Sequence, residues 1–277
     1  MPPLSPQLTV RPLTTSAEMR AGVEVYRAAF ALAATDPAVS PRLLAALQRN
    51  AGSVLGAFAG EDLVGFTYGF LGSEAGTVYH YSQVAAVRPD WQGRGVGRAL
   101  KLSQRDYVLS TGVTRMRWAF DPVRTRNAHF NLDVLGATGR WFERDFYGVE
   151  DIGRDPGMRT DRLIVEWDLL RPVGSPAPPP AYTGWGTTRP EDGDVLLGAP
   201  RDWDGLVARD RRAASRLRDD LAAEMRRLID RGYVAISCLT CTDDTAVYRF
   251  RYERRARQGR ETEERRPHGR DAEERAS

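Results

Sequence analysis

The chain has 277 residues, enough for one large domain or two smaller ones. Its 40 Lys and Arg residues nearly balance 37 Asp and Glu residues, and the net charge of +3 gives no indication of nucleic-acid binding. The longest purely apolar run, residues 28–34, has 7 residues, whereas a membrane-spanning helix needs ~20. Two cysteines and three histidines argue against a disulfide framework or a structural zinc site. We therefore expect a cytoplasmic protein that binds no metal, no nucleic acid and no membrane.

Strand and helix patterns alternate along residues 1–170, which we expect to form one domain. Apolar or alternating runs predict strands at residues 8–13, 53–59, 63–71, 77–87, 116–120, 140–146 and 163–169. Helical spacing and capping residues predict helices at residues 16–33, 41–49, 96–110 and 127–135. Ser16 is the expected cap of the first helix, and Pro41 suits the start of the second because its missing N–H is not needed there.

A proline-rich segment at residues 171–188 predicts a semi-rigid linker, because such a run fits neither a helix nor a strand ladder. Beyond it, residues 189–252 predict a smaller unit of one helix and a β-hairpin. The helical stripe of Leu217, Leu221, Met225 and Leu228 suits either a core or the contact surface of a homodimer. Residues 253–277 are highly charged and almost free of apolar side chains, so we expect this tail to be disordered.

The segment most informative about chemistry runs from Val84 to Leu100. A predicted strand ends at Val87, turns through Pro89 and reaches the sequence Gln92-Gly-Arg-Gly-Val-Gly97 just before a helix. Glycines at such a turn allow the main chain to approach a ligand closely. The loop amides and the first amides of the helix then point the same way, and the helix dipole adds to their attraction for an anion. This pattern predicts a cradle for a diphosphate.

Two common phosphate-binding motifs do not fit this loop. A P-loop ends in Gly-Lys-Ser/Thr, which is absent, and a G-x-G-x-x-G fingerprint fails at its third glycine from either starting point. The order Gln-x-x-Gly-x-Gly after a strand, filled here by Gln92, Gly95 and Gly97, resembles motif A of the GNAT acyl-CoA transferases.

A second segment extends the resemblance. Residues 120–137, with Phe-Asp-Pro followed by Arg-Asn-Ala-His-Phe-Asn-Leu and Leu-Gly, resemble one branch of predicted acyltransferases in that superfamily. The resemblance implies an α+β fold of layered α/β type. We expect a mixed, mostly antiparallel twisted sheet flanked by helices, splayed between its fourth and fifth strands, with a smaller C-terminal helix-hairpin unit.

The resemblance also implies where acetyl-CoA or another acyl-CoA binds. The pantetheine arm is expected to lie in the splayed gap along the main chain of Ala85, Ala86 and Val87, and the diphosphate on residues 92–97. Arg94, Arg98 and Lys101 are expected to meet phosphate oxygens. The expected cofactor-binding residues are Ala85, Ala86, Val87, Gln92, Gly93, Arg94, Gly95, Val96, Gly97, Arg98 and Asn127.

The family's reaction is direct transfer, in which an amine attacks the thioester while its carbonyl is polarised by a backbone N–H, here that of Val87. Many members carry a tyrosine as general acid at the position that Leu132 occupies here, so the acid must come from elsewhere. His129 and Tyr81 are the candidate catalytic residues. Arg126 and Gln83 are the candidate substrate contacts, since a guanidinium suits a substrate carboxylate.

The expected reaction is transfer of an acetyl group, with succinyl as the alternative, to the primary amine of a small molecule such as an amino acid. A CoA-binding sensor or assembly protein without catalysis is a second reading, since the tyrosine is missing. Arginine-driven RNA binding is a third and weaker reading, because no platform of basic and aromatic residues is evident. Cys238 and Cys241 have C-x-x-C spacing, but no second pair accompanies them.

Overall fold

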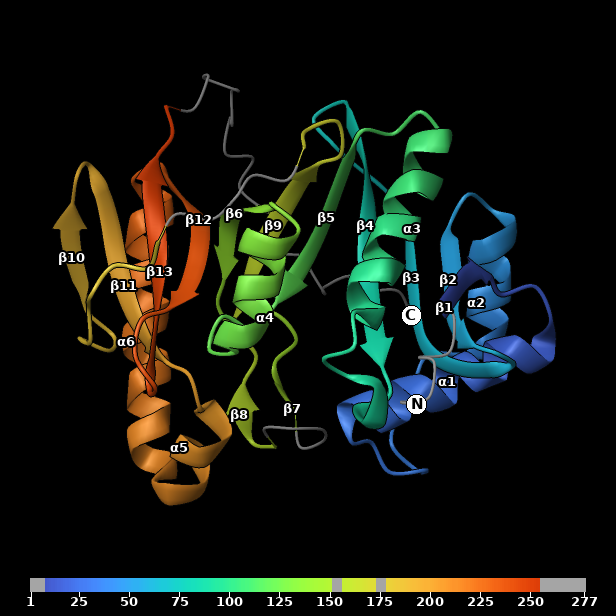
Figure 1. Cartoon of the computed structure of the whole chain (residues 1–277), viewed down its shortest axis with the longest axis horizontal. Coiled ribbons are helices and arrows are strands. Elements are labelled where there is room, and N and C mark those ends of the chain that lie inside the picture. Colours follow the sequence, from blue (N-terminus) through green and yellow to red (C-terminus); the bar gives the residue numbers. More distant parts are fainter. Residues whose placement is uncertain (1–7, 151–155, 173–177, 255–277) are drawn as a thin grey trace, which may run out of the picture.

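A computed structural model describes residues 8–150, 156–172 and 178–254 (Figure 1). Eleven of its strands form one mixed sheet in the order β1-β2-β3-β4-β5-β9-β6-β12-β13-β11-β10. Their bounds are β1 (Leu8–Pro12), β2 (Ser53–Ala59), β3 (Asp62–Glu74), β4 (Thr77–Val87), β5 (Arg115–Phe120), β6 (Thr138–Glu143), β9 (Arg162–Asp168), β10 (Thr188–Glu191), β11 (Asp194–Pro200), β12 (Tyr233–Thr240) and β13 (Thr245–Tyr252). A separate short ladder pairs β7 (Val149–Glu150) with β8 (Met158–Arg159).

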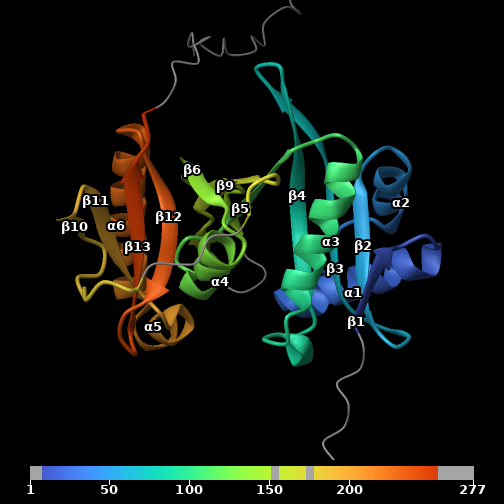
Figure 2. The same cartoon turned by 45° about the horizontal axis from the view of Figure 1, so that its top comes forward.

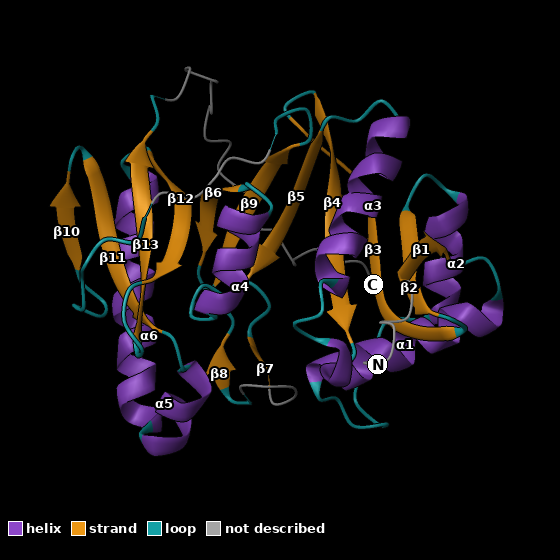
Figure 3. Cartoon of the chain, viewed as in Figure 1, coloured by secondary structure: helices purple, strands orange, loops and turns teal. Residues whose placement is uncertain are grey.

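Helices cover the sheet, as Figure 3 shows by colour. They are α1 (Ser16–Phe30), α2 (Pro41–Arg49), α3 (Val96–Ser110), α4 (Thr125–His129), α5 (Trp203–Arg209) and α6 (Arg211–Asp230), with a 3₁₀ turn η1 (Pro89–Trp91) and a π turn η2 (Phe130–Val134). Alternating side chains of the sheet separate two apolar clusters. Phe58 and Phe66 pack with α1 and α2, whereas Ala57 and Val64 pack under α3. The fold confirms the expected mixed sheet flanked by helices.

The sheet opens between its fourth and fifth strands. β4 and β5 run parallel, and their register holds only at His80↔Met116 and Tyr81↔Arg117. On its other edge β4 pairs with β3 along its full length. Residues 82–87 therefore have no strand neighbour toward β5. In Figures 1 and 2, α3 and α4 stand on either side of this opening, and the predicted splay is confirmed.

The C-terminal strands continue the same sheet. β12 joins β6 through the pair Ala235↔Gly139, and β13, β11 and β10 extend the sheet outward. One apolar cluster contains both Trp118 and Leu132 from the first part of the chain and Leu221 and Tyr248 from the last. β10 and β11 were not expected from the sequence.

The division into a domain at 1–170, a linker at 171–188 and a unit at 189–252 stays a prediction. Nearly all of the predicted disordered tail lies outside the described residues.

Several predicted boundaries need correction. The cap of α1 is Thr15, not Ser16: Thr15 Oγ1 accepts the Glu18 amide at 3.1 Å, and Glu18 Oε2 accepts the Thr15 amide at 3.0 Å. The strand predicted at 140–146 is β6, which begins at Thr138 and ends at Glu143, because the chain turns with Asp145 at a φ of 57°. The helix predicted at 127–135 begins two residues earlier and ends in the π turn.

Candidate active site

The loop between β4 and α3 is built on two glycines with left-handed backbone. Gly93 and Gly95 have φ angles of 77° and 82°, which side-chain-bearing residues rarely adopt. Gly95 is also the residue from which α3 begins, and a Cβ there would meet nothing within 4 Å. The local sequence therefore sets both the sharp turn and the open space above it.

The amides of this loop are not used inside the protein. The backbone N–H groups of residues 93–98 have no hydrogen-bond acceptor among the described residues, whereas the Ala99 amide donates to the Gly95 carbonyl at 3.0 Å and starts the helical ladder. Free amides at the start of a 15-residue helix, together with its dipole, favour an anion. The predicted diphosphate cradle is therefore available for a ligand.

Side chains from α4 and η2 face this loop across the opening. Arg126 Nη2 lies 3.5 Å from where a Cβ on Gly93 would stand, and the ring of Phe130 approaches the Cβ position of Gly97 to 3.9 Å. Arg126 makes no hydrogen bond or ion pair within residues 8–150, 156–172 and 178–254. Sequence reasoning expected Arg126 at a substrate carboxylate, but its position beside Gly93 suits a phosphate oxygen equally well.

The other cationic side chains expected at phosphate differ in position. Arg94 and Arg98 are exposed, and the Arg94 guanidinium lies 5.0 Å from the centroid of the Trp91 ring. Lys101 is only 3% exposed, and its Nζ donates to Ser82 Oγ at 2.8 Å. The expectation that Lys101 meets phosphate oxygens is wrong, because its side chain is buried between α3 and the sheet and does not extend toward the loop.

The end of β4 carries the main-chain groups expected to hold a pantetheine arm. Its register with β3 shifts between Ser82 and Val84, so Gln83 is the extra residue of a β-bulge. Ala85, Ala86 and Val87 follow, without a strand on their β5 side. Gln92 Nε2 donates to the Val87 carbonyl at 3.2 Å and so ties the glycine loop to the strand end.

A buried polar cluster lies on the α4 side. Asp133 accepts hydrogen bonds from Ser237 Oγ at 2.6 Å and from the Cys238 amide at 2.9 Å. His129 Nδ1 lies 3.1 Å from both Asp133 Oδ2 and the Cys238 carbonyl oxygen. Because both partners are acceptors, Nδ1 carries a proton, and 44% of the His129 side chain is exposed. His129 is thus turned toward β12, and its catalytic role stays a prediction.

Two further predicted residues differ in exposure. Asn127 is exposed on α4, so its side chain is accessible to a ligand. Leu132 is 2% exposed and belongs to the apolar core, so the position at which the resemblance implied a tyrosine supplies no proton here.

Tyr81 and Gln83 share Tyr147 as a neighbour. Gln83 Nε2 donates to the Tyr147 hydroxyl at 3.4 Å, and the Tyr81 ring lies 5.6 Å from that of Phe70. Burial, and after it the neighbouring Tyr147, raises the pKa of Tyr81 well above its usual value, so its hydroxyl stays protonated at neutral pH. The Arg162 guanidinium lies 5.2 Å from the Tyr147 ring centroid. Sequence reasoning did not identify Tyr147 or Arg162, since both come from distant parts of the chain.

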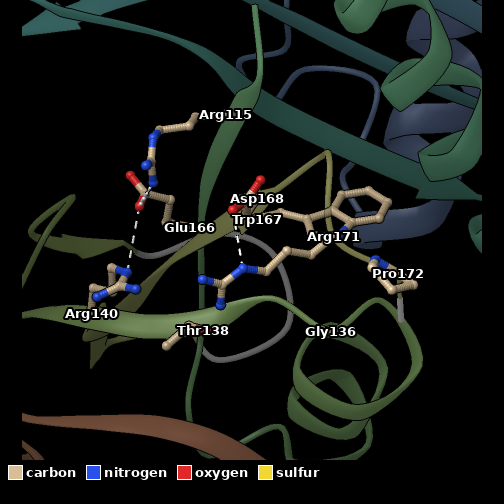
Figure 4. Close-up of a pocket in the computed structure, with 9 residues that line it drawn as sticks. All are labelled: Arg115, Gly136, Thr138, Arg140, Glu166, Trp167, Asp168, Arg171 and Pro172. Carbon is tan, nitrogen blue, oxygen red and sulfur yellow. Dashed lines mark hydrogen bonds and ion pairs between the residues drawn. The ribbon is translucent and has the colours of Figure 1, made fainter. Parts of the chain in front are cut away.

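A small cavity of about 140 Å³ lies elsewhere, among residues of β5, β6 and β9 and the chain after β9 (Figure 4). Arg115 at the start of β5 lines it, whereas the glycine loop follows the end of β4. Because β4 and β5 are parallel, this cavity lies at the opposite edge of the sheet from the loop. Its charges pair internally, Arg115 with Glu166 at 2.8 Å and Arg171 with Asp168 at 3.3 Å, so it is not part of the candidate site.

The described part of the chain holds neither a membrane-spanning helix nor a cluster of metal ligands. None of its helices combines the length and the apolar character that a membrane crossing requires. Within residues 8–150, 156–172 and 178–254, no three His, Cys, Asp or Glu side chains gather as a metal site.

Comparison with known proteins gives a family match over part of the chain. Residues 21–132 match the model of the Acetyltransferase (GNAT) family. Solved structures of similar fold include YncA from Salmonella typhimurium with its cofactor acetyl-CoA, at 21% identity over 62% of this chain and 99% of that chain with a TM-score of 0.46. The ribosomal-protein-S18-alanine N-acetyltransferase from Escherichia coli has 20% identity over 64% and 99% of the two chains, with a TM-score of 0.45. PaiA N-acetyltransferase from Thermoplasma acidophilum, in complex with coenzyme A, has 17% identity over 58% and 99%, with a TM-score of 0.41. No curated protein sequence matches the chain.

Proposed function

We propose that this chain, an enzyme of the GNAT acetyltransferase family through its domain at residues 21–132, transfers an acyl group from coenzyme A to the primary amine of a small molecule. The observation that carries the proposal is the set of loop amides at residues 93–98, which have no acceptor in the described chain and lie at the start of α3. They suit a diphosphate because each amide presents a donor and the helix dipole favours the negative charge.

The opening between β4 and β5 supports a place for the rest of the donor. The main chain of Ala85, Ala86 and Val87 has no strand on that side, so a pantetheine arm can bond to it as a missing strand would. Arg126, near Gly93, and exposed Arg98 are the side chains that we assign to the phosphates. Gln92, whose amide holds the Val87 carbonyl, keeps the loop in place.

In this proposal the reaction is direct. The amine attacks the thioester carbonyl, the new C–N bond forms, and the C–S bond breaks with its electron pair passing to sulfur. A backbone N–H at the end of β4, which we assign to Val87, polarises the carbonyl oxygen. Holding the two reactants in line supplies ~7–11 kcal/mol of the barrier reduction when alignment is good.

The acceptor is expected to approach from the side of Tyr81 and Gln83. Their neighbour Arg162 donates to a backbone carbonyl and lies over the Tyr147 ring, but makes no ion pair with a described residue. It therefore suits a carboxylate on the acceptor, in line with an amino acid. The acyl group is proposed to be acetyl, with succinyl as the alternative. Tyr81, on the acceptor side, and His129, on α4, remain the proposed side chains for proton transfer.

Calorimetry with coenzyme A tests the donor assignment. We expect binding to the wild type and at least about 100-fold weaker binding to Gly95→Asp/Gly97→Asp, because carboxylates then stand where the diphosphate binds. Gly112→Asp is the matched control, since Gly112 also has a left-handed φ of 81° and follows the C-terminal end of the same helix. Absence of binding to the wild type, or equal binding by the double variant, contradicts the proposal.

A second candidate function is a CoA-binding sensor, which the buried Leu132 favours. Free-thiol release from acetyl-CoA and succinyl-CoA with a panel of amines and amino acids separates the two. The transferase releases thiol with at least one acceptor, whereas a sensor binds coenzyme A and remains silent with every amine.

A further inference from the structure

Lys101 is the one lysine of this chain, whose other 39 basic residues are arginines. It is also buried, with 3% of its surface exposed, and it forms no ion pair with any residue of the described chain. Lysines are rarely buried without a carboxylate. Unlike arginine, a lysine can release its proton when it is buried. The position therefore combines a residue type and an environment found nowhere else in this protein.

The side chain lies where the sheet begins to open. β4 and β5 are last paired at Tyr81↔Arg117, and the next residues on the two strands are Ser82 and Trp118. Lys101 Nζ contacts both: it donates to Ser82 Oγ at 2.8 Å and lies 3.9 Å from the centroid of the Trp118 ring. It thus reaches the closed end of the opening from α3, the helix that starts at the glycine loop.

A directed chain of hydrogen bonds holds Lys101 in place. Ser82 Oγ donates to Gln104 Oε1 at 2.8 Å, and Gln104 Nε2 donates to Ser53 Oγ at 2.9 Å. Ser53 Oγ also lies 2.9 Å from His80 Nε2. The three bonds from Lys101 to Ser53 all run away from Lys101, so an ammonium there uses one of its N–H groups in the chain and keeps the others available.

We propose that Lys101 Nζ donates the proton to the coenzyme A thiolate as it leaves the acyl group. Leu132, at the position where the resemblance implied a tyrosine, cannot supply this proton. The inference rests on the proposed function. As the amine nitrogen bonds to the carbonyl carbon and the C–S pair moves to sulfur, a proton passes from Lys101 to sulfur and gives the free thiol. The proton that the acceptor nitrogen loses restores the ammonium, so the transfer consumes and releases no net proton.

The electrostatics agree with an acid that works near neutrality. Burial lowers the pKa of Lys101 to about 7. The groups facing it are Ser82 on β4 and Trp118 on β5, with Ser53 on β2 and His80 on β4 reached through the chain. Among these His80 is titratable, and burial followed by the nearby Lys101 lowers the pKa of His80 to about 4, so it stays neutral.

Kinetics with Lys101→Met test the role, since methionine fills a similar volume without a proton. We expect kcat to fall about 100-fold or more while the calorimetric affinity for coenzyme A stays within about 2-fold. In the wild type kcat declines as pH rises through the pKa of Lys101, and this decline is absent in Lys101→Met. Exposed Arg226→Met on α6 is the control and keeps wild-type kcat. Wild-type kcat, or an unchanged pH profile, in Lys101→Met overturns the proposal.

NMR of the single lysine in the wild-type protein tests the proposal without relying on a variant that must fold. Because the chain has one lysine, protein labelled with ¹³C-lysine gives a single Cε signal set. We expect this signal to titrate near neutral pH and to shift when coenzyme A is added. If calorimetry shows coenzyme A binding and the lysine signal does not shift, the lysine proposal is overturned while the proposed function stands. If coenzyme A does not bind at all, the proposed function fails first.

Discussion

Two buried polar clusters flank the opening between β4 and β5, and they differ in how completely their charged group is satisfied. On the α4 side, the carboxylate of Asp133 accepts from Ser237, from the Cys238 amide and from His129. On the α3 side, Lys101 has one hydrogen bond and an aromatic ring. The Asp133 carboxylate, which lies in η2 and is surrounded by donors from α4 and β12, joins the C-terminal strands to the first part of the sheet. An ammonium with unused protons is placed for chemistry.

The largest expected effect is on stability and concerns Asp133, whose carboxylate accepts three hydrogen bonds. Asp133→Ala leaves the donors of Ser237 and Cys238 buried without an acceptor, and we expect a loss of about 4 kcal/mol of unfolding free energy. Denaturant unfolding measures it, with Asp133→Asn as the milder variant that keeps one acceptor. Affinity for coenzyme A, measured on the folded fraction, should change little. A loss under about 1 kcal/mol contradicts the assignment of Asp133 as a structural carboxylate.

His80 predicts a loss of stability in acid. Its pKa falls from 6.5 to about 4 on folding because the ring is buried and lies near Lys101. The unfolded chain then binds the extra proton between these pKa values, so unfolding becomes easier as pH falls through that window. The full effect is about 3 kcal/mol. Unfolding of the wild type and of His80→Gln from neutral to acidic pH measures it, and equal slopes for the two proteins would count against a buried neutral histidine.

Lys101 predicts a pH dependence of the same sign, but in the neutral to basic range. Its pKa falls from 10.5 to about 7 on folding. Between these values the unfolded chain carries the additional proton, so the folding stability from this group rises with pH. We expect the wild type to gain about 2 kcal/mol relative to Lys101→Met between pH ~7 and pH ~9. Chemical unfolding at the two pH values measures the difference. A constant gap between the proteins would mean that Lys101 titrates alike in both states.

The smallest expected effect concerns the two cysteines. Burial, then Asp133 and Cys241, raises the pKa of Cys238 well above its usual value, so its thiol stays protonated and shielded. Cys241 is partly exposed. A thiol reagent should therefore modify Cys241 in the native protein and Cys238 only after unfolding, as peptide mass analysis can show. Modification of Cys238 at the rate of Cys241 would mean that β12 leaves α4 easily.

The parts of the fold that sequence reasoning found are those with local causes. The left-handed Gly93 and Gly95, the proline at the start of α2 and the apolar alternation of β4 each act within a few residues. The glycine loop could therefore be located from the sequence together with its unused amides. The splay also followed, through resemblance to the family rather than from any local pattern.

What the sequence did not predict depends on contacts between distant residues. Arg126 reaches Gly93 across the opening, and Asp133 meets Ser237 over more than a hundred residues of chain. The pairing of β12 with β6 was missed because no pattern in the sequence of either strand specifies which strand it pairs with. Lys101 stands out in the sequence as the single lysine among 40 Lys and Arg residues. Composition alone, however, does not show whether such a residue is buried or lies on the surface.

The central claim is that the main-chain amides of residues 93–98 hold the diphosphate of coenzyme A, and amide NMR of these residues during a coenzyme A titration tests it most directly. We predict that the signals of Gly93, Gly95 and Gly97 move together downfield, as amides do when they begin to donate to phosphate oxygens, while the signal of Gly112 at the far end of α3 stays in place. Saturable binding with the three loop glycines unmoved would contradict the account.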